Sequence, residues 1–97
     1  MARPLRITYE GAVHHVTIRG NDRRTIFRTD RDREHFVNKL AESVRQYEIR
    51  LYLFTLMKNH VHMVLETPQG NLSRFMHRLQ TAYTVYFQRK HLRATET

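Results

Sequence analysis

Two strand-like segments separated by only two residues limit the fold more than any other part of the sequence. Residues 49–57, IRLYLFTLM, form a nearly continuous apolar run, and residues 60–67, HVHMVLET, follow after Lys58 and Asn59. A connection this short joins antiparallel neighbours. The pattern therefore predicts a β-hairpin.

A third strand and two helices complete the expected order of elements. Residues 12–20, AVHHVTIRG, are rich in β-branched side chains and end at a Gly-Asn turn signal, which predicts a strand. Thr29, with Asp32 three residues later, resembles a capping box and predicts the start of a helix. Asn71 is the expected cap of a second helix, which we expect to fray through residues 88–97.

Each predicted helix carries an apolar stripe with the three- and four-residue spacing of a buried face. The stripes comprise Phe36, Val37, Leu40, Val44 and Tyr47 in the first helix, and Leu72, Phe75, Met76, Leu79, Ala82, Tyr83 and Tyr86 in the second. Because Tyr83 and Tyr86 belong to the second stripe, we expect both to be core residues.

The order strand, helix, strand, strand, helix predicts an α+β fold of the ferredoxin-like type, with an antiparallel sheet and two helices on one face. The final strand of that fold is absent from the pattern. In the complete fold this strand lies beside the first, so we expect the first strand to have an open edge. A homodimer formed through this edge is one expected assembly.

The length of 97 residues predicts a single domain, with a basic arm at about 1–11, a core at about 12–91 and a tail at 92–97. No apolar run approaches the roughly 18 residues of a membrane span, and the N-terminus lacks the apolar segment of a signal peptide. The absence of cysteine excludes disulfides and thiolate metal sites. We therefore expect a cytoplasmic protein with no membrane partner.

Basic residues strongly outnumber acidic ones. There are 17 Lys and Arg against 9 Asp and Glu, a net charge of +8. Arginine, the better bidentate ligand of phosphate, is more frequent than lysine. This balance favours nucleic acid as a partner, and a basic protein with another role is the alternative.

His60 and His62 lie two residues apart in the second strand of the hairpin. Side chains alternate along a strand, so both imidazoles are expected on one face, roughly 7 Å apart at their backbones. Such a pair can converge on one divalent ion. If the first strand is adjacent, His15 or Thr17 could face the pair, and His15 is a candidate third ligand. Two imidazoles alone do not complete a metal site, and a solvated sheet face that binds nothing is the alternative.

Two segments of the sequence together resemble a known family. RPLRITYEGAVHHVTIRGNDRRTIF and LYLFTLMKNHVHMVLETPQGNLSRFMHRLQTAYTVYFQRKH are similar to the REP-associated tyrosine transposases. These are relatives of the insertion-sequence single-tyrosine transposases, within the HUH endonucleases. The likeness runs from about Arg3 to His91. Family members usually carry a proline before the Asn-His pair, where this chain has Lys58.

The resemblance implies metal-dependent DNA chemistry. His60 and His62 correspond to the metal-binding pair of the family, which implies Mg²⁺ or Mn²⁺ as the cofactor. The implied partner is single-stranded or hairpin DNA. A tyrosine hydroxyl attacks a phosphate of this DNA and forms a 5′ phosphotyrosine link, and the stored bond energy later rejoins the strands. The metal ion neutralises the charge that develops on the phosphate.

The family's nucleophilic tyrosine and a third metal ligand lie on a further helix. We therefore expect the catalytic tyrosine beyond Thr97, with the last strand and the catalytic helix missing from a C-terminally truncated chain. Tyr9, in the N-terminal arm, has no motif support as a substitute. Whether these 97 residues act as an enzyme is thus left open by the sequence.

A basic loop and the N-terminal arm are the expected DNA contacts, at phosphates or at the foot of a hairpin. The residues are Arg3, Arg6, Arg19, Asn21, Arg23, Arg24 and Lys58. Two alternatives to an active nicking domain remain open: a non-catalytic remnant that binds structured single-stranded DNA, and a protein that only self-associates through its open sheet edge.

Overall fold

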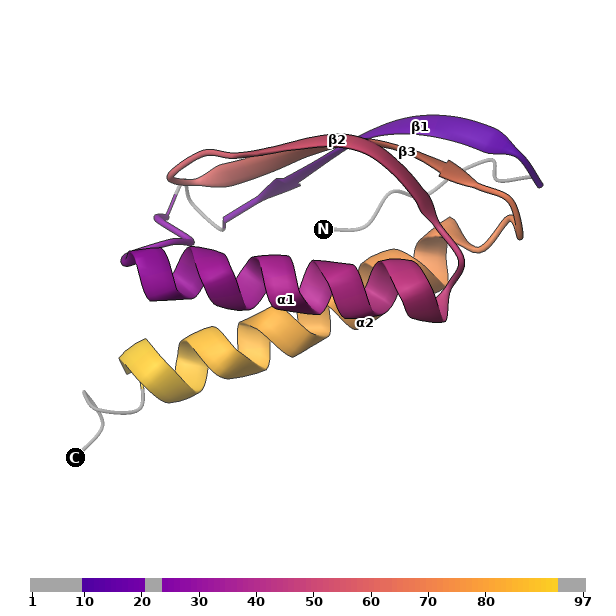
Figure 1. The fold of residues 1–97 in the computed structure, drawn as a ribbon. Helices are drawn as coiled ribbons and strands as arrows, with labels where there is room; N and C mark the ends of the chain where they lie inside the picture. Colours follow the sequence, from indigo (N-terminus) through magenta and orange to yellow (C-terminus); the bar gives the residue numbers. More distant parts are fainter. Residues whose placement is uncertain (1–9, 21–23, 93–97) are drawn as a thin grey trace.

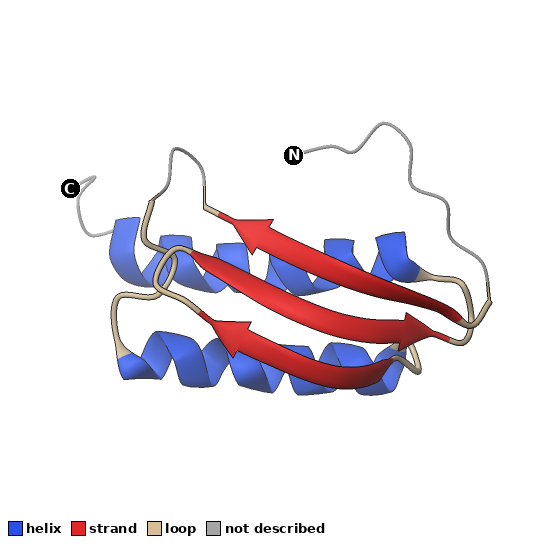
Figure 2. Cartoon of the chain, turned by 90° about the horizontal axis from the view of Figure 1, so that it is seen from above, coloured by secondary structure: helices blue, strands red, loops and turns tan. Residues whose placement is uncertain are grey.

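The computed structural model describes residues 10–20 and 24–92. Its elements are β1 (Ala12–Arg19), α1 (Asp30–Gln46), β2 (Arg50–Leu56), β3 (His60–Thr67), α2 (Leu72–Phe87) and a π-helical turn, η2 (Gln88–Leu92). The strands form one antiparallel sheet in the order β1-β3-β2. Both helices cover the same face of this sheet (Figures 1 and 2). The predicted α+β arrangement of the ferredoxin-like type is confirmed, and the described residues contain three of its strands.

Most of the expected basic arm and of the expected tail lies outside the described residues. The predicted strand and helix bounds agree with the observed ones to within one residue at each end that was predicted. None of the described helices is long and apolar enough to cross a membrane.

The start of α1 is fixed by the predicted capping box. The Asp32 backbone N–H donates to the Thr29 hydroxyl at 3.1 Å, and the Thr29 backbone N–H donates to the Asp32 carboxylate at 3.2 Å. Each bond satisfies a backbone N–H that has no partner within the helix. Sequence reasoning therefore located this helix start correctly.

The core lies between the sheet and the two helices. On β3, Val61, Met63 and Leu65 are fully buried and point toward the helices. Phe36 and Leu40 of α1 meet them from the helix layer, together with the buried part of the α2 stripe. Val37 was predicted to join this core but is 36% exposed, because it lies at the margin of the buried stripe.

The hairpin of β2 and β3 contains one irregularity. The register shifts between Leu51 and Leu53, so Tyr52 is an extra residue in β2. The bulge leaves Tyr52 exposed, and its hydroxyl donates to the carboxylate of Glu66 at 2.5 Å. Glu66 is thereby held at the end of the outer face of β3 that lies away from the hairpin turn.

The end of α2 departs from the expected fraying. Residues 88–92 form η2, and two of its side chains reach the start of α1. The Lys90 ammonium lies 3.0 Å from one carboxylate oxygen of Asp32, and His91 Nε2 lies 2.8 Å from the other. Tyr86 donates its hydroxyl to the same carboxylate at 2.7 Å. This buried carboxylate therefore ties the end of the second helix to the start of the first.

Asn71 precedes α2 as predicted, but its side chain does not cap the helix. Its amide nitrogen instead donates to the backbone carbonyl of Tyr47 at 2.9 Å. This bond joins the end of α1 to the start of α2. The position of the residue was therefore predicted correctly, whereas its bonding partner was not.

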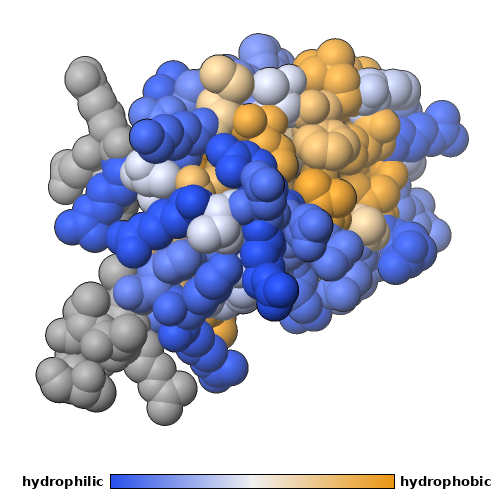
Figure 3. Space-filling view, turned by 60° about the vertical axis from the view of Figure 1, so that its left-hand side comes forward, coloured by the Kyte–Doolittle hydropathy of each residue, from blue (hydrophilic) through white to orange (hydrophobic). Residues whose placement is uncertain are grey.

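Several large apolar side chains remain exposed. Those in or directly after β2 are Tyr52, Leu53, Phe54 and Met57, and Val13 of β1 is 62% exposed. Both β1 and β2 lie at edges of the described sheet. Figure 3 shows one continuous apolar patch bordered by hydrophilic side chains. The open edge expected for the first strand is thus present among the described residues.

Candidate metal and nucleic-acid site

His60 and His62 lie on the face of β3 that is turned away from the helices. Their neighbours Val61 and Met63 are fully buried, whereas both histidines are partly exposed. The alternation of a strand thus places both imidazoles on one side, as the sequence predicted. Their ring centroids are 4.8 Å apart and the ring planes meet at 85°.

Hydrogen bonds hold the Nδ1 atom of each imidazole. His60 Nδ1 lies 2.7 Å from the side-chain oxygen of Asn59, which is an acceptor only, so this Nδ1 carries the proton. His62 Nδ1 lies 3.1 Å from the hydroxyl of Thr17, its partner across β1 and β3. In the neutral imidazole of His60, the lone pair is therefore on Nε2.

The surroundings of His62 favour its neutral form. Loss of water contacts lowers the pKa of His62, and the nearby His60, His15 and Arg19 side chains lower it further. A neutral imidazole is the form that can bind a metal ion. The lowered pKa of His62 therefore favours the form that the predicted ligand role requires.

His15 was a candidate third ligand, and the structure places it near one member of the pair. Its ring centroid is 5.5 Å from that of His62, and it pairs across the sheet with Val64. Within residues 10–20 and 24–92, however, no group of three or more His, Asp or Glu side chains is placed to hold a metal ion. The described site therefore consists of two imidazoles.

Three of the predicted DNA contacts surround this pair. Arg19 is exposed and lies opposite His60 in the β1–β3 register. Lys58, in the hairpin turn, and Arg24, after β1, are also exposed. The other four predicted contacts, Arg3, Arg6, Asn21 and Arg23, lie outside the described residues. These three cations thus lie at the histidine end of the sheet.

Comparisons with known proteins identify the family. The model of the IS200-like transposase family matches residues 8–97. The chain belongs to this family. No curated protein matches the chain significantly.

A solved structure described as the REP-associated tyrosine transposase bound to a REP hairpin shares the fold. Its TM-score is 0.76 at 15% sequence identity. The match covers 89% of this chain and 53% of that one, so the chain spans about half the length of the structure it resembles. The transposase fold expected from the sequence is therefore confirmed.

Tyr83 and Tyr86 were predicted to be core residues, and the structure places both in the helix layer. Tyr83 is 8% exposed, and its hydroxyl donates to the backbone carbonyl of Ile26. Burial raises the pKa of Tyr83, and the nearby Asp32 carboxylate raises it further. Tyr86 is partly buried and bonded to Asp32. Both lie in the layer behind the sheet, as predicted, and Tyr9 lies outside the described residues.

Sequence reasoning missed Asn59 as a partner of the histidine pair, and it left open whether His15 or Thr17 faces the pair. Asn59 directly precedes His60, so its proximity was visible in the sequence. Thr17 could be placed beside His62 only with the register of β1 against β3. The supporting hydrogen bonds therefore required the folded sheet.

Proposed function

We propose that the chain forms the DNA-binding and metal-holding part of a transposase that nicks and joins single-stranded DNA through a phosphotyrosine intermediate. The observation that carries this proposal is the adjacent placement of His60 and His62 on the exposed sheet face of an IS200-like transposase family member. The REP hairpin in the similar structure supports single-stranded or hairpin DNA as the partner. The proposed compartment is the cytoplasm.

Mg²⁺ or Mn²⁺ is the proposed cofactor, with His60 and His62 as its protein ligands. Both ions favour six-coordinate shells that are filled mostly by water and phosphate oxygens, so two protein nitrogens fit such a shell. A bound ion would neutralise charge on a phosphate oxygen. Asn59 and Thr17 would hold the imidazoles so that both Nε2 atoms serve as ligands.

The proposed DNA contacts are the basic residues around this pair. Arg19, opposite His60, is placed to bind a phosphate next to the one at the histidines, and its guanidinium can do so through two hydrogen bonds. The full proposed set is Arg3, Arg6, Arg19, Asn21, Arg23, Arg24 and Lys58. These contacts fix the position of the DNA and carry no sequence information themselves.

One assay separates catalysis from binding alone. Hairpin DNA with a single-stranded foot is incubated with the chain and Mn²⁺, and covalent protein–DNA adducts are sought on a denaturing gel. An adduct would assign a nucleophile to residues 1–97. Binding without an adduct would assign the chain the binding and metal-holding role only.

Affinity for single-stranded DNA is expected to fall about 100-fold between 50 and 200 mM salt, as for roughly five phosphate contacts. Arg19→Ala should reduce the slope of log affinity against log salt by about 0.7, the value of one contact to a single strand. Fluorescence anisotropy measures both quantities. Arg45→Ala removes an exposed charge in the last turn of α1, at the other end of the molecule, and should leave the slope unchanged. A salt-insensitive affinity would contradict DNA binding.

Self-association through the β1 edge is a second candidate role. β1 has no neighbour beyond it among the described strands, and Val13 on this strand is largely exposed. An unpaired edge can join a second copy into a continuous sheet. We expect sedimentation velocity at micromolar concentration to detect a dimer, and we expect His15→Pro to weaken it. A stable monomer at these concentrations would exclude this role.

A further inference from the structure

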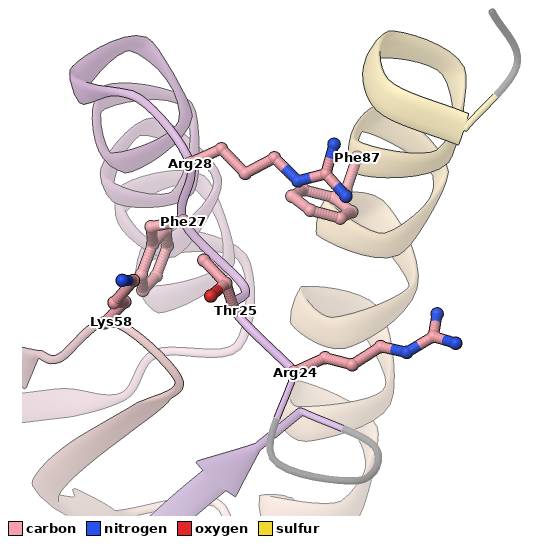
Figure 4. Close-up of a pocket in the computed structure, with 6 residues that line it drawn as sticks. All are labelled: Arg24, Thr25, Phe27, Arg28, Lys58 and Phe87. Atoms are coloured by element: carbon pink, nitrogen blue, oxygen red, sulfur yellow. The ribbon is translucent and has the colours of Figure 1, made fainter. Parts of the chain in front are cut away.

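A pocket of about 490 Å³ lies where the segment after β1 passes the end of α2. Its lining consists of Arg24, Thr25, Phe27, Arg28, Lys58 and Phe87 (Figure 4). The lining contains three cations, two aromatic rings and one hydroxyl, and no acidic side chain. Its volume falls in the range of pockets that bind small organic groups.

The walls of the pocket are fixed by the fold. The backbone N–H groups of Ile26 and Phe27 donate to the carbonyl of Lys58 at 2.9 and 3.4 Å. Phe27 is 2% exposed and packs edge-on against Phe36. A Cβ at Gly20 would lie 2.5 Å from the Arg24 carbonyl oxygen, so only glycine permits this close return of the chain. The backbone of the pocket and its Phe27 wall are therefore held in place by the fold.

Arg28 and Phe87 form a flat, positively charged surface inside the pocket. The guanidinium carbon of Arg28 lies 5.5 Å from the centroid of the Phe87 ring, and Figure 4 shows the Arg28 side chain reaching over this ring. Unpaired nucleic-acid bases stack on guanidinium planes as they do on aromatic rings. The Arg28 guanidinium thus lies over the Phe87 ring in a cation–π contact, and the Arg28 side chain is exposed to a ligand.

The cations of the pocket are not neutralised by described carboxylates. Within residues 10–20 and 24–92, the ion pairs formed by Lys, Arg and His involve neither Arg24, Arg28 nor Lys58. Free cations beside a flat stacking surface match a nucleotide, which combines a phosphate with a planar base.

The pocket lies close to the histidine pair. Lys58 is two residues before His60 in the chain. The Gly20 backbone N–H donates to the Asn59 carbonyl at 3.2 Å, which joins the end of β1 to the same turn. A DNA strand that crosses the histidine end of the sheet would therefore meet the pocket within a few nucleotides.

We propose that this pocket binds one unpaired nucleotide of single-stranded DNA, with its base stacked on the Arg28 guanidinium above Phe87 and its phosphate at Arg24 and Lys58. The inference rests on the proposed function, because it assumes DNA at the neighbouring histidines. In a duplex both faces of a base are already covered by neighbouring bases. The pocket therefore selects single-stranded over double-stranded DNA beside the metal-holding pair.

The test compares two oligomers with equal charge, in EDTA so that no metal contributes. The probes are a decamer of thymidine nucleotides and a decamer of abasic nucleotides, measured by fluorescence anisotropy. Because base stacking contributes about 1–3 kcal/mol per base, the unmodified chain is expected to bind the thymidine decamer at least about tenfold more tightly. Arg28→Lys keeps the positive charge but removes the planar guanidinium. It should reduce the ratio of the two affinities, thymidine decamer over abasic decamer, to about threefold or less.

Phe87→Leu should reduce the same ratio and leave affinity for the abasic decamer unchanged. Phe87 also contacts Tyr83, so a thermal melt must show that this variant folds. Arg28 is exposed, and Arg28→Lys carries the test alone if Phe87→Leu does not fold. Arg45→Lys, at the far end of α1, is the matched control and should keep the full ratio.

Three outcomes would overturn the proposal. A ratio near one in the unmodified chain would show that bases are not bound. A ratio that persists in Arg28→Lys, or in a folded Phe87→Leu, would place base binding elsewhere while leaving DNA binding intact. If neither decamer binds at all, the proposed DNA-binding function fails together with the pocket.

Discussion

Replacing His60 or His62 with alanine is expected to weaken Mn²⁺ binding by roughly 100-fold. Loss of a supporting outer-shell partner alone costs 10- to 100-fold in metal affinity, and loss of a ligand itself costs at least as much. Each variant would leave the metal ion one imidazole ligand, where the unmodified chain has two adjacent imidazoles. Titration of Mn²⁺ followed by electron paramagnetic resonance measures the fraction of free ion directly.

Asn59→Ala tests the geometry of the same site. It removes the acceptor at 2.7 Å that holds His60 Nδ1, and should weaken Mn²⁺ binding by about 10- to 100-fold while leaving both ligands present. His77→Ala, at an exposed position of α2, is the matched control and should bind Mn²⁺ as the unmodified chain does. If His60→Ala and His77→Ala give the same titration curve, the sheet histidines are not the metal ligands.

Asp32→Asn is expected to lower the free energy of unfolding by about 3 kcal/mol. Asp32 is fully buried, and Lys90 and His91 both lie within 3.0 Å of its carboxylate. Removing one partner of a buried ion pair typically costs about 3–5 kcal/mol, and the partial exposure of Lys90 places this case at the lower end. Urea denaturation measures the loss, and thermal unfolding should show a midpoint lower by more than about 10 °C.

The same carboxylate sets an acid limit on stability. Burial alone would raise the pKa of Asp32, but hydrogen bonds from Tyr86, the Arg28 backbone, Lys90 and His91 outweigh it and hold the pKa far below the usual range. A folded-state pKa below the unfolded one stabilises the protein above the ordinary carboxyl pKa of about 3.9. This contribution is lost progressively as the pH falls below that value.

Asp32→Asn should therefore remove this part of the acid dependence of unfolding. Asp30→Asn is the matched control, because the side chain of Asp30 is fully exposed and its ion pair among the described residues is with Arg33 at 3.6 Å. We expect Asp30→Asn to change stability by less than about 1 kcal/mol. If Asp32→Asn and Asp30→Asn lowered the free energy of unfolding equally, the role assigned to the buried carboxylate would be contradicted.

Local patterns in the sequence predicted those features that depend on neighbours in the chain. The capping box joins residues three positions apart, and the alternation along 60–67 directly determines which side chains share a face. The short connection at Lys58 and Asn59 likewise predicts that the two strands it joins pair in the antiparallel direction. For these elements, and for the positions of His60 and His62, sequence and structure agree.

Features that depend on distant pairs could not be predicted in the same way. Asp32 was assigned only its local role as a cap, because Lys90 and His91 lie about 60 positions away in the chain. The polar, basic composition after α2 indicated fraying, yet the buried carboxylate orders residues 88–92. The pocket at Phe87 and the contact of Thr17 with His62 could not be predicted for the same reason. Both bring together residues that are far apart in the chain and meet only in the folded protein.

The bond between Tyr52 and Glu66 has a consequence for how a polyanion would approach. It anchors a negative charge at one end of the outer sheet face, whereas Arg19 and Lys58 mark the opposite end beside His60. Arg50 lies opposite Glu66 in the β2–β3 register and offsets this charge, so this end attracts a long negatively charged molecule less than the histidine end does. Before any short-range contact forms, this difference in charge favours collisions in which an incoming strand meets the sheet at the histidine end.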